Sequence, residues 1–251
     1  MPQPSTTPDA GRPLLSVVIP VYNELDTWRE LLARVQAVSV PQVDMQIVLV
    51  EDGSRDGTRK QLEDFAASLP EATPGRPRPV KVIFHQVNRG KGAALRTGFE
   101  SADGDFVIIQ DADLEYDPND YPGLLAPLLA DQADVVYGSR FLAARSRKGY
   151  LKNYLANKFL TNLSNLTTGL KLTDMETCYK VFRRDVLRRV RLEQDRFGFE
   201  PEITARIGKL GVRVVELPIS YIARTHEEGK KIGWKDGLKA IWCILKYGVR
   251  K

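Results

Sequence analysis

Short apolar runs alternate with longer amphipathic stretches through the first half of the chain. Runs of this length that are rich in β-branched residues are typical of buried strands, and they lie at Leu15–Pro20, Met45–Glu51, Val80–His85, Asp105–Gln110 and Asp134–Gly138. The stretches between them have the length and apolar spacing of helices, at Leu25–Val38, Arg55–Leu69, Lys91–Ala102 and Asn119–Ala130. This alternation predicts an α/β fold with a mostly parallel sheet and helices on both of its faces.

The second half is less regular, and we expect it to complete the same sheet. Its predicted elements are a helix at Leu151–Thr167, a segment at Asp174–Phe182, a helix around Pro201–Leu210, a strand at Val212–Leu217 and an amphipathic helix at Trp234–Val249. Residues 1–13 lack the apolar stretch of a signal peptide, so we expect a disordered leader there and a single domain over residues 14–251.

Composition narrows the class of protein. With 43% apolar and 27% charged residues, the chain is neither disordered nor collagen-like. Cys178 and Cys243 lie far apart, which gives no disulfide framework or zinc spacing and favours buried thiols in a reducing compartment. No run of 18 apolar residues occurs, so we predict no membrane span and expect any membrane contact to be peripheral.

Charge is distributed unevenly along the chain. Residues 1–135 hold 12 lysines and arginines against 21 aspartates and glutamates, whereas residues 136–251 hold 25 against 11. An acidic half suits a bound cation, and a basic half suits a phosphate-bearing or membrane-surface partner. Nucleic acid would also suit the basic half, but no aromatic stacking pattern or nucleic-acid motif accompanies it, so we expect no nucleic-acid partner.

Four polar clusters follow the predicted strands, and ligands of such sheets collect at the carboxyl ends of strands. The clusters are Pro20–Glu24, Glu51–Thr58, Asn88–Gly92 and Asp111–Asp113. We therefore expect them to converge on one crevice.

Asp111 and Asp113 are two residues apart in an extended segment, so their carboxylates can point the same way. Paired oxygen ligands suit Mg²⁺ or Mn²⁺, which also bind phosphate oxygens. The alternative is a turn with self-capping aspartates. Their place directly after an apolar run favours the metal site.

Asp52 and Lys91 are candidates for contacts with a nucleotide. A carboxylate at the end of a strand can hydrogen-bond a base or ribose, although the following turn could serve only to cap a helix. Lys91 lies between two glycines at a predicted helix start, where it could meet a phosphate with help from backbone N–H groups.

Taken in order, IPVYNE, VEDGSRDGT, NRGKGAALRTGF and DADLEYDP resemble the motifs of the inverting family 2 glycosyltransferases, which have the GT-A fold. YGSRF, TDMETCYKVFR and FGFEPEITARI are similar to the branch that includes dolichol-phosphate mannosyltransferases and polyprenyl-phosphate glucosyltransferases. The resemblance covers about Leu14 to Lys246. It implies transfer of a hexose from GDP-mannose or UDP-glucose to a polyprenyl or dolichyl phosphate.

The resemblance also implies roles for residues at matching positions. The donor-binding set would be Pro20, Tyr22, Glu24, Asp52, Lys91, Asp111 and Ala112. The metal ligands would be Asp111, Asp113 and Glu115, although many relatives have glutamine at the last position. The acceptor phosphate would meet Arg140, Arg224, Lys230 and Lys231, and the catalytic set would be Asp113, Arg140, Asp174 and Glu176.

Several of these roles have structural alternatives. Arg140 could instead form a structural ion pair. Asp174, the better candidate for a base, could cap a turn, and Glu176 could pair with Lys180. The acceptor phosphate is already anionic, so positioning should matter more than base strength. One of Glu200 and Glu202 is expected to line the site.

Segments 140–172 and 224–251 are expected to face the acceptor and the membrane. In the last helix Trp234, Leu238, Ile241, Trp242, Leu245 and Val249 form a stripe beside lysines. This is the pattern of an interfacial helix, and packing onto the core is the alternative. We expect a cytoplasmic enzyme held peripherally on an anionic membrane, with room for a membrane-protein partner. The competing functions are transfer to a soluble acceptor or glycan, and a nucleotide-binding module without catalysis.

Overall fold

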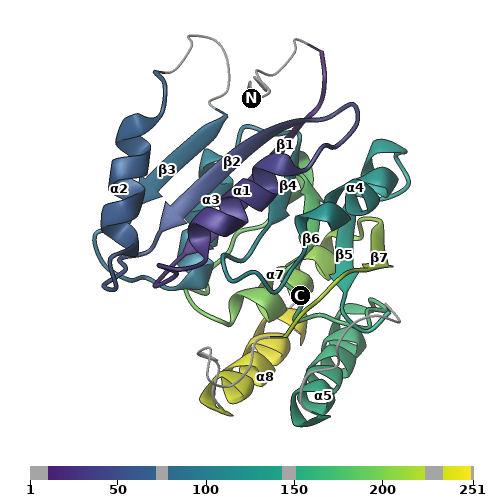
Figure 1. Cartoon of the computed structure of the whole chain (residues 1–251). Coiled ribbons are helices and arrows are strands. Elements are labelled where there is room, and N and C mark those ends of the chain that lie inside the picture. Colours follow the sequence, from purple (N-terminus) through teal and green to yellow (C-terminus); the bar gives the residue numbers. More distant parts are fainter. Residues whose placement is uncertain (1–10, 72–78, 143–150, 224–233, 250–251) are drawn as a thin grey trace.

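A computed structural model describes residues 11–71, 79–142, 151–223 and 234–249 (Figure 1). Its centre is a seven-stranded sheet with the order β3-β2-β1-β4-β6-β5-β7. The strands are β1 (Leu14–Val21), β2 (Asp44–Glu51), β3 (Val80–Phe84), β4 (Phe106–Ile109), β5 (Val135–Ser139), β6 (Lys180–Arg183) and β7 (Val214–Pro218). Only β6 runs antiparallel to its neighbours β4 and β5. The predicted α/β class with a mostly parallel sheet is confirmed.

The helices are α1 (Trp28–Ala37), α2 (Thr58–Ser68), α3 (Lys91–Ser101), α4 (Tyr121–Leu129), α5 (Leu151–Thr168), α6 (Arg184–Arg188), α7 (Phe199–Leu210) and α8 (Trp234–Val249), with a short 3₁₀ turn at Pro118–Asp120. Each predicted helix is present, and most of their ends differ by a few residues. Helix α6 was not predicted, because five residues are too few for an apolar period to be recognised.

The order of the strands explains why helices cover both faces of the sheet. The chain steps outward from β1 to β2 to β3 and then returns to β4 on the other side of β1. With right-handed crossovers, α1 and α2 lie on one face and α3 lies on the other. The rings of Trp28 in α1 and Phe65 in α2 are 5.6 Å apart, while Phe99 of α3 lies 6.1 Å from Phe199 of α7.

The segment Asp174–Phe182 was expected to be one element, but only its end forms a strand. Residues before Lys180 form a loop that crosses the carboxyl end of the sheet, and β6 then inserts between β4 and β5. Tyr179 and Phe182 are fully buried there. Burying a large apolar side chain contributes about 1.5–3 kcal/mol, which favours insertion over an exposed loop.

The last residues of the expected leader, 11–13, contact the sheet. Residues 1–10 lie outside the described residues, but residues 11–13 do not. The Pro13 carbonyl accepts a hydrogen bond from the Asp44 N–H at 2.9 Å, and Arg12 forms an ion pair with Asp44. The chain therefore contacts the first residue of β2 before β1 begins.

Helices α5 and α8 pack side by side at one end of the molecule, drawn at the bottom of Figure 1. A side chain on Gly248 would lie 2.5 Å from the Thr167 hydroxyl, so the two backbones approach closely. The buried face of α8 consists of Ala240, Cys243, Ile244 and Tyr247. In the described part of the chain, no helix is both long and apolar enough to cross a membrane.

Candidate active site

The loops that follow β1 and β2 are locked together by short polar contacts. The Asn23 N–H donates to the Ser54 hydroxyl at 3.0 Å, and the Arg55 N–H donates to the Asn23 side chain at 2.9 Å. Glu24 adds a third contact, from its N–H to the Thr58 hydroxyl at 3.1 Å. Asn23 has a φ of 53°, a left-handed conformation that asparagine tolerates better than most residues. These contacts place Tyr22 and Glu24 beside the turn after Asp52.

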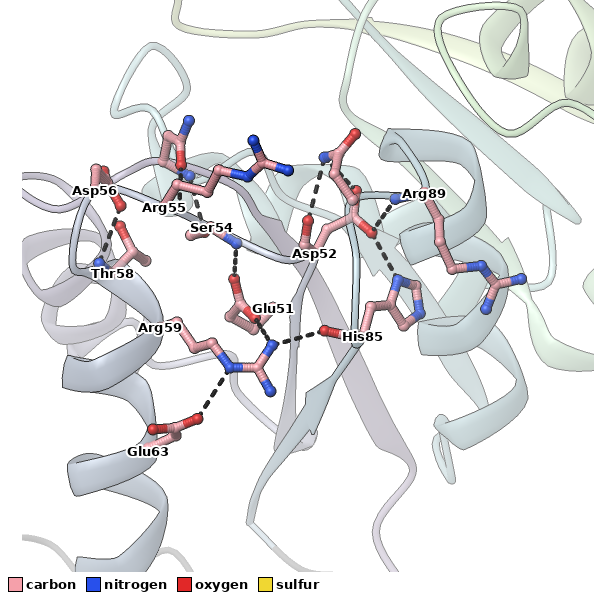
Figure 2. A network of polar contacts seen from close by, with 12 residues as sticks. Glu51, Asp52, Ser54, Arg55, Asp56, Thr58, Arg59, Glu63, His85 and Arg89 are labelled. Carbon is pink, nitrogen blue, oxygen red and sulfur yellow. Dashed lines mark hydrogen bonds and ion pairs between the residues drawn. The ribbon is translucent and has the colours of Figure 1, made fainter.

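The predicted donor residue Asp52 holds the loop after β3 (Figure 2). Its carboxylate contacts the His85 ring at 2.7 Å and accepts hydrogen bonds from the Asn88 side chain, the Arg89 N–H and the Gly90 N–H at 2.7–2.9 Å. Only 2% of Asp52 is exposed. With these four contacts, the buried carboxylate of Asp52 holds the loop after β3 in place. Its direct contact with a nucleoside stays a prediction.

Gly90 and Gly92, on either side of Lys91, allow the chain to pack closely against another loop. A side chain on Gly90 would lie 2.5 Å from the Asp195 carbonyl, and one on Gly92 would lie 2.2 Å from the Gln194 carbonyl. The Ala93 N–H donates to the Asp195 carbonyl at 3.0 Å. The start of α3 is therefore packed against the loop before α7, and three N–H groups of this turn already have protein acceptors. These three N–H groups are therefore not available to a phosphate, and the contact of Lys91 with a phosphate stays a prediction.

The ammonium of Lys91 lies between two carboxylates. It is 2.9 Å and 3.0 Å from the two oxygens of Asp111, and 3.1 Å from Glu200. Burial alone would lower the pKa of Lys91, but the charges of Asp111 and Glu200 outweigh it and hold that pKa above its ordinary value. Lys91 is therefore a permanent cation at the centre of the site.

The residues predicted to hold a metal ion alternate in direction. Ala112 is 4% exposed and belongs to the hydrophobic core, so only its backbone can reach a donor. Asp111 and Asp113 flank it and are partly exposed. Leu114 follows with a φ of 62°, an uncommon conformation that is often found at functional loops.

The third predicted ligand, Glu115, is not supported by the geometry. Its carboxylate accepts a hydrogen bond from the Tyr221 hydroxyl at 3.0 Å, and its carbonyl accepts one from the Ile222 N–H at 2.9 Å. Within the described ranges, no three Asp, Glu, His or Cys side chains come together as a metal site. One carboxylate oxygen of Glu115 is held by Tyr221, and its role as a ligand stays a prediction.

Arg140 and Asp174 form a buried bidentate ion pair. The Nε and Nη2 atoms of Arg140 each donate to an Asp174 oxygen at 2.7 Å, and the Arg140 N–H adds a bond of 3.0 Å. Asp174 is fully buried. Both of its oxygens are engaged, so it can take a proton only if the pair opens, which weakens its candidacy as a base. This geometry favours the structural alternative for Arg140, and its contact with an acceptor phosphate stays a prediction.

Glu176 lies in the same loop and is only partly buried. One of its carboxylate oxygens is buried and has no hydrogen-bond partner among the described residues. Burial and the charge of Glu200 raise the pKa of Glu176 to about 8. The expected partner Lys180 is also fully buried, and its ammonium donates instead to the Thr177 carbonyl. Glu176 is therefore largely protonated at neutral pH.

Of the two glutamates in Phe199–Glu202, Glu200 lines the site through Lys91. Glu202 is buried behind it, where it accepts hydrogen bonds from the N–H groups of Glu193 and Gln194 and pairs with Arg206. His85, the partner of Asp52, was missed by sequence reasoning, although a polar residue at the end of an apolar strand was a signal for it. Arg224, Lys230 and Lys231 lie outside the described residues.

The model of the family described as glycosyl transferase family 2 matches residues 16–191. The chain belongs to this family. Among sequence relatives of this family 2 chain is an undecaprenyl-phosphate 4-deoxy-4-formamido-L-arabinose transferase of Pseudomonas fluorescens, 31% identical over 86% of the chain and 59% of the relative. Another is an undecaprenyl-phosphate mannosyltransferase of Micrococcus luteus, 30% identical over 92% of the chain and 93% of the relative. The chain thus spans about 60% of the length of the formamido-arabinose transferases it matches.

Solved structures support the GT-A fold. The glucosyl-3-phosphoglycerate synthase of Mycobacterium tuberculosis, in complex with Mn²⁺, UDP and phosphoglyceric acid, has a TM-score of 0.69 and covers 96% of this chain and 81% of its own. The identity is 18%, so the likeness concerns the fold alone. Another crystal structure of the same enzyme contains Mg²⁺ and UDP.

Proposed function

We propose that this family 2 glycosyltransferase transfers a hexose, mannose or glucose, from a nucleotide sugar to a polyprenyl phosphate with inversion at the anomeric carbon. The observation that carries the proposal is the convergence of Asp52, Lys91 and Asp111 from three strand ends on one polar site. Sequence relatives named as undecaprenyl-phosphate transferases favour this acceptor.

A divalent cation fits the donor side. Mg²⁺ is commonly held by one or two carboxylates together with phosphate oxygens of the substrate. Asp111 and Asp113 supply two carboxylates, and the Lys91 ammonium already lies on Asp111, which indicates that this carboxylate is positioned for a positive charge. When bound, Mg²⁺ or Mn²⁺ supplies charge neutralisation for the leaving diphosphate. Pro20, Tyr22, Glu24 and the Ala112 backbone would line the nucleoside side.

Transfer needs no strong base if the acceptor is a phosphate. Its anionic oxygen forms the bond to the anomeric carbon as the bond from that carbon to the donor diphosphate breaks, and the nucleoside diphosphate leaves. The chain's task is then to position the two anions. The Arg140 guanidinium lies 5.2 Å from the Tyr221 ring, and the Tyr221 hydroxyl binds Glu115. Through Tyr221, Arg140 is linked to the loop after β4 that carries Asp111 and Asp113. Arg140 would therefore help to position the acceptor phosphate.

Helices α5 and α8 are suited to contact a lipid surface. Exposed apolar residues recur on each helix at spacings of four, seven and eleven residues, and they are Leu155, Phe159 and Leu166 on α5 and Leu238, Trp242, Leu245 and Val249 on α8. Each of the seven is at least 48% exposed, so core packing does not account for these stripes. We propose that the enzyme is held peripherally on an anionic membrane by these two stripes, at its cytoplasmic face.

The deciding experiment mixes the purified protein with radiolabelled GDP-mannose or UDP-glucose, polyprenyl phosphate and Mg²⁺ or Mn²⁺, followed by extraction into organic solvent. We expect label in the organic phase only when polyprenyl phosphate and a metal ion are both present. Label that enters a water-soluble glycan instead would favour the rival transferase. Nucleotide binding without any transfer would favour the inactive module.

A further inference from the structure

The ammonium of Lys91 lies on Asp111, one of the two carboxylates proposed above as metal ligands. It contacts both oxygens of Asp111 at 2.9 and 3.0 Å and one oxygen of Glu200 at 3.1 Å. The three side chains are 18%, 20% and 7% exposed, so water screens these charges poorly. They come from three different elements: the first residue of α3, the loop after β4, and the second residue of α7.

The backbone under Lys91 is fixed, but its side chain can change partner. On one side the Gly90 N–H is held by Asp52, and on the other the Ala93 N–H is held by the Asp195 carbonyl. Gly92 lies too close to Gln194 for the turn to shift toward α7. A lysine side chain with four flexible carbons can still move its ammonium by a few ångströms, and Glu200 remains within reach when it does.

We propose that Lys91 is a built-in counter-cation of Asp111, which makes binding of a divalent metal ion depend on simultaneous binding of the nucleotide diphosphate. This inference rests on the proposed function, because it assumes that the donor carries a diphosphate. A metal ion alone must displace the ammonium from Asp111, since two cations on one poorly screened carboxylate repel each other. With a diphosphate present, the displaced ammonium gains phosphate oxygens while it stays paired with Glu200.

The arrangement has a functional consequence. Coupling between two ligands is reciprocal, so the nucleotide must also bind more tightly when the metal ion is present. Without nucleotide, Asp111 is neutralised by the chain itself. The metal ion then arrives with the donor, and the acidic loop does not retain it after the nucleoside diphosphate leaves.

The test is a titration of Mn²⁺, followed by the electron paramagnetic resonance signal of the free ion, on the full chain with and without saturating UDP or GDP. Lys91→Met and Lys91→Gln remove the charge, and Lys91→Arg keeps it. Lys81→Met is the matched control, because Lys81 also pairs with one aspartate, Asp103, and its loss changes the net charge equally. Thermal melting checks that each variant folds, and Lys91→Gln retains hydrogen-bond donors if Lys91→Met does not fold.

In the unmodified protein, we expect UDP or GDP to tighten Mn²⁺ binding by about tenfold or more, a typical size for coupling between two sites. Lys91→Met and Lys91→Gln should tighten nucleotide-free Mn²⁺ binding by about the same factor and remove most of the coupling. Lys81→Met should leave both quantities near their original values, and Lys91→Arg, which keeps the charge, should not tighten nucleotide-free Mn²⁺ binding.

Two outcomes overturn the inference: Mn²⁺ binding that neither nucleotide strengthens, or nucleotide-free affinity that Lys91→Met and Lys91→Gln leave unchanged or weaken. Neither readout uses polyprenyl phosphate. Strong coupling in a protein that makes no lipid-linked product would refute the proposed function alone. Active transfer with unchanged Mn²⁺ affinity in the variants would refute this inference alone.

Discussion

Arg140 and Asp174 depend on each other, because the Asp174 side chain is fully buried, the Arg140 side chain is only 12% exposed, and their charges compensate each other. Removing one partner of a buried pair leaves an uncompensated charge and costs about 3–5 kcal/mol. We therefore expect Arg140→Ala to lower the free energy of unfolding by about this amount in a denaturant titration. The double variant with Asp174→Ala should recover part of the loss. If Arg140→Ala is as stable as the parent, the guanidinium is available for an acceptor phosphate instead.

Asp113 is partly exposed on a loop, and its removal should affect transfer rather than folding. We expect Asp113→Ala to reduce metal-dependent transfer by about a hundredfold or more, as loss of a charge-stabilising group typically does, with little change in melting temperature. Asp64→Ala on α2, where 61% of the Asp64 side chain is exposed, is the control. Full activity of Asp113→Ala in EDTA would contradict the metal assignment.

Glu176 gives the fold a pH dependence of predictable sign. Its pKa of about 8 exceeds the ordinary value of 4.5, so its contribution to stability is fully present below about pH 4.5 and is lost as the pH rises through 8. Glu176→Gln removes this loss. We expect the variant to melt at about the same temperature as the parent at pH 4.5 and about 4 °C or more above it at pH 8.5, which corresponds to about 2 kcal/mol. Equal melting temperatures at pH 8.5 would mean that Glu176 is solvated.

At the scale of elements, the start of α3 is positioned by contact with the loop before α7. Because a side chain on Gly92 would lie 2.2 Å from the Gln194 carbonyl, we expect Gly92→Ala to destabilise the protein by about 1–3 kcal/mol, as overpacking does. Gly123 in α4 is the matched control, since nothing lies within 4 Å of an added side chain. Gly123→Ala should stabilise the helix by up to about 1 kcal/mol. If Gly92→Ala does not change the stability, the loop before α7 can move to make room for the added methyl group.

At the scale of the whole molecule, two helices with apolar stripes project from the half of the chain that carries the positive charge. We expect the protein to bind anionic vesicles reversibly and less strongly as salt is added. Trp242→Gln with Leu245→Gln should weaken vesicle binding and transfer to long-chain polyprenyl phosphate more than transfer to a short soluble analogue.

The control for this experiment is Leu129→Gln on α4, an exposed apolar residue away from both stripes. Point substitutions are preferable to deletion of α8, because its other face buries Cys243 and Ile244 and its loss would disturb the core. Flotation assays that detect no binding at low salt would contradict the membrane role of these stripes.

The sequence by itself determined the alternation of strands and helices and the position of polar residues at the ends of strands. These follow from local periodicity, which a chain displays whether or not it is folded. The motif order also predicted the family, and the match over residues 16–191 confirmed it. The outward direction of the stripe on α8 was left open, because a periodic apolar face can meet either the core or a lipid surface.

Only the tertiary structure decided which charges meet. Lys91 and Glu200 are more than a hundred residues apart in the chain. Arg140 precedes α5 in the sequence and Asp174 follows it. No local sequence pattern links the members of either pair. The insertion of β6 between β4 and β5 was equally hidden, since strand order depends on long-range pairing. Long-range contacts arise only when burial of the apolar core brings distant segments together. The packing of that core therefore determines which charged side chains meet at the carboxyl ends of the strands.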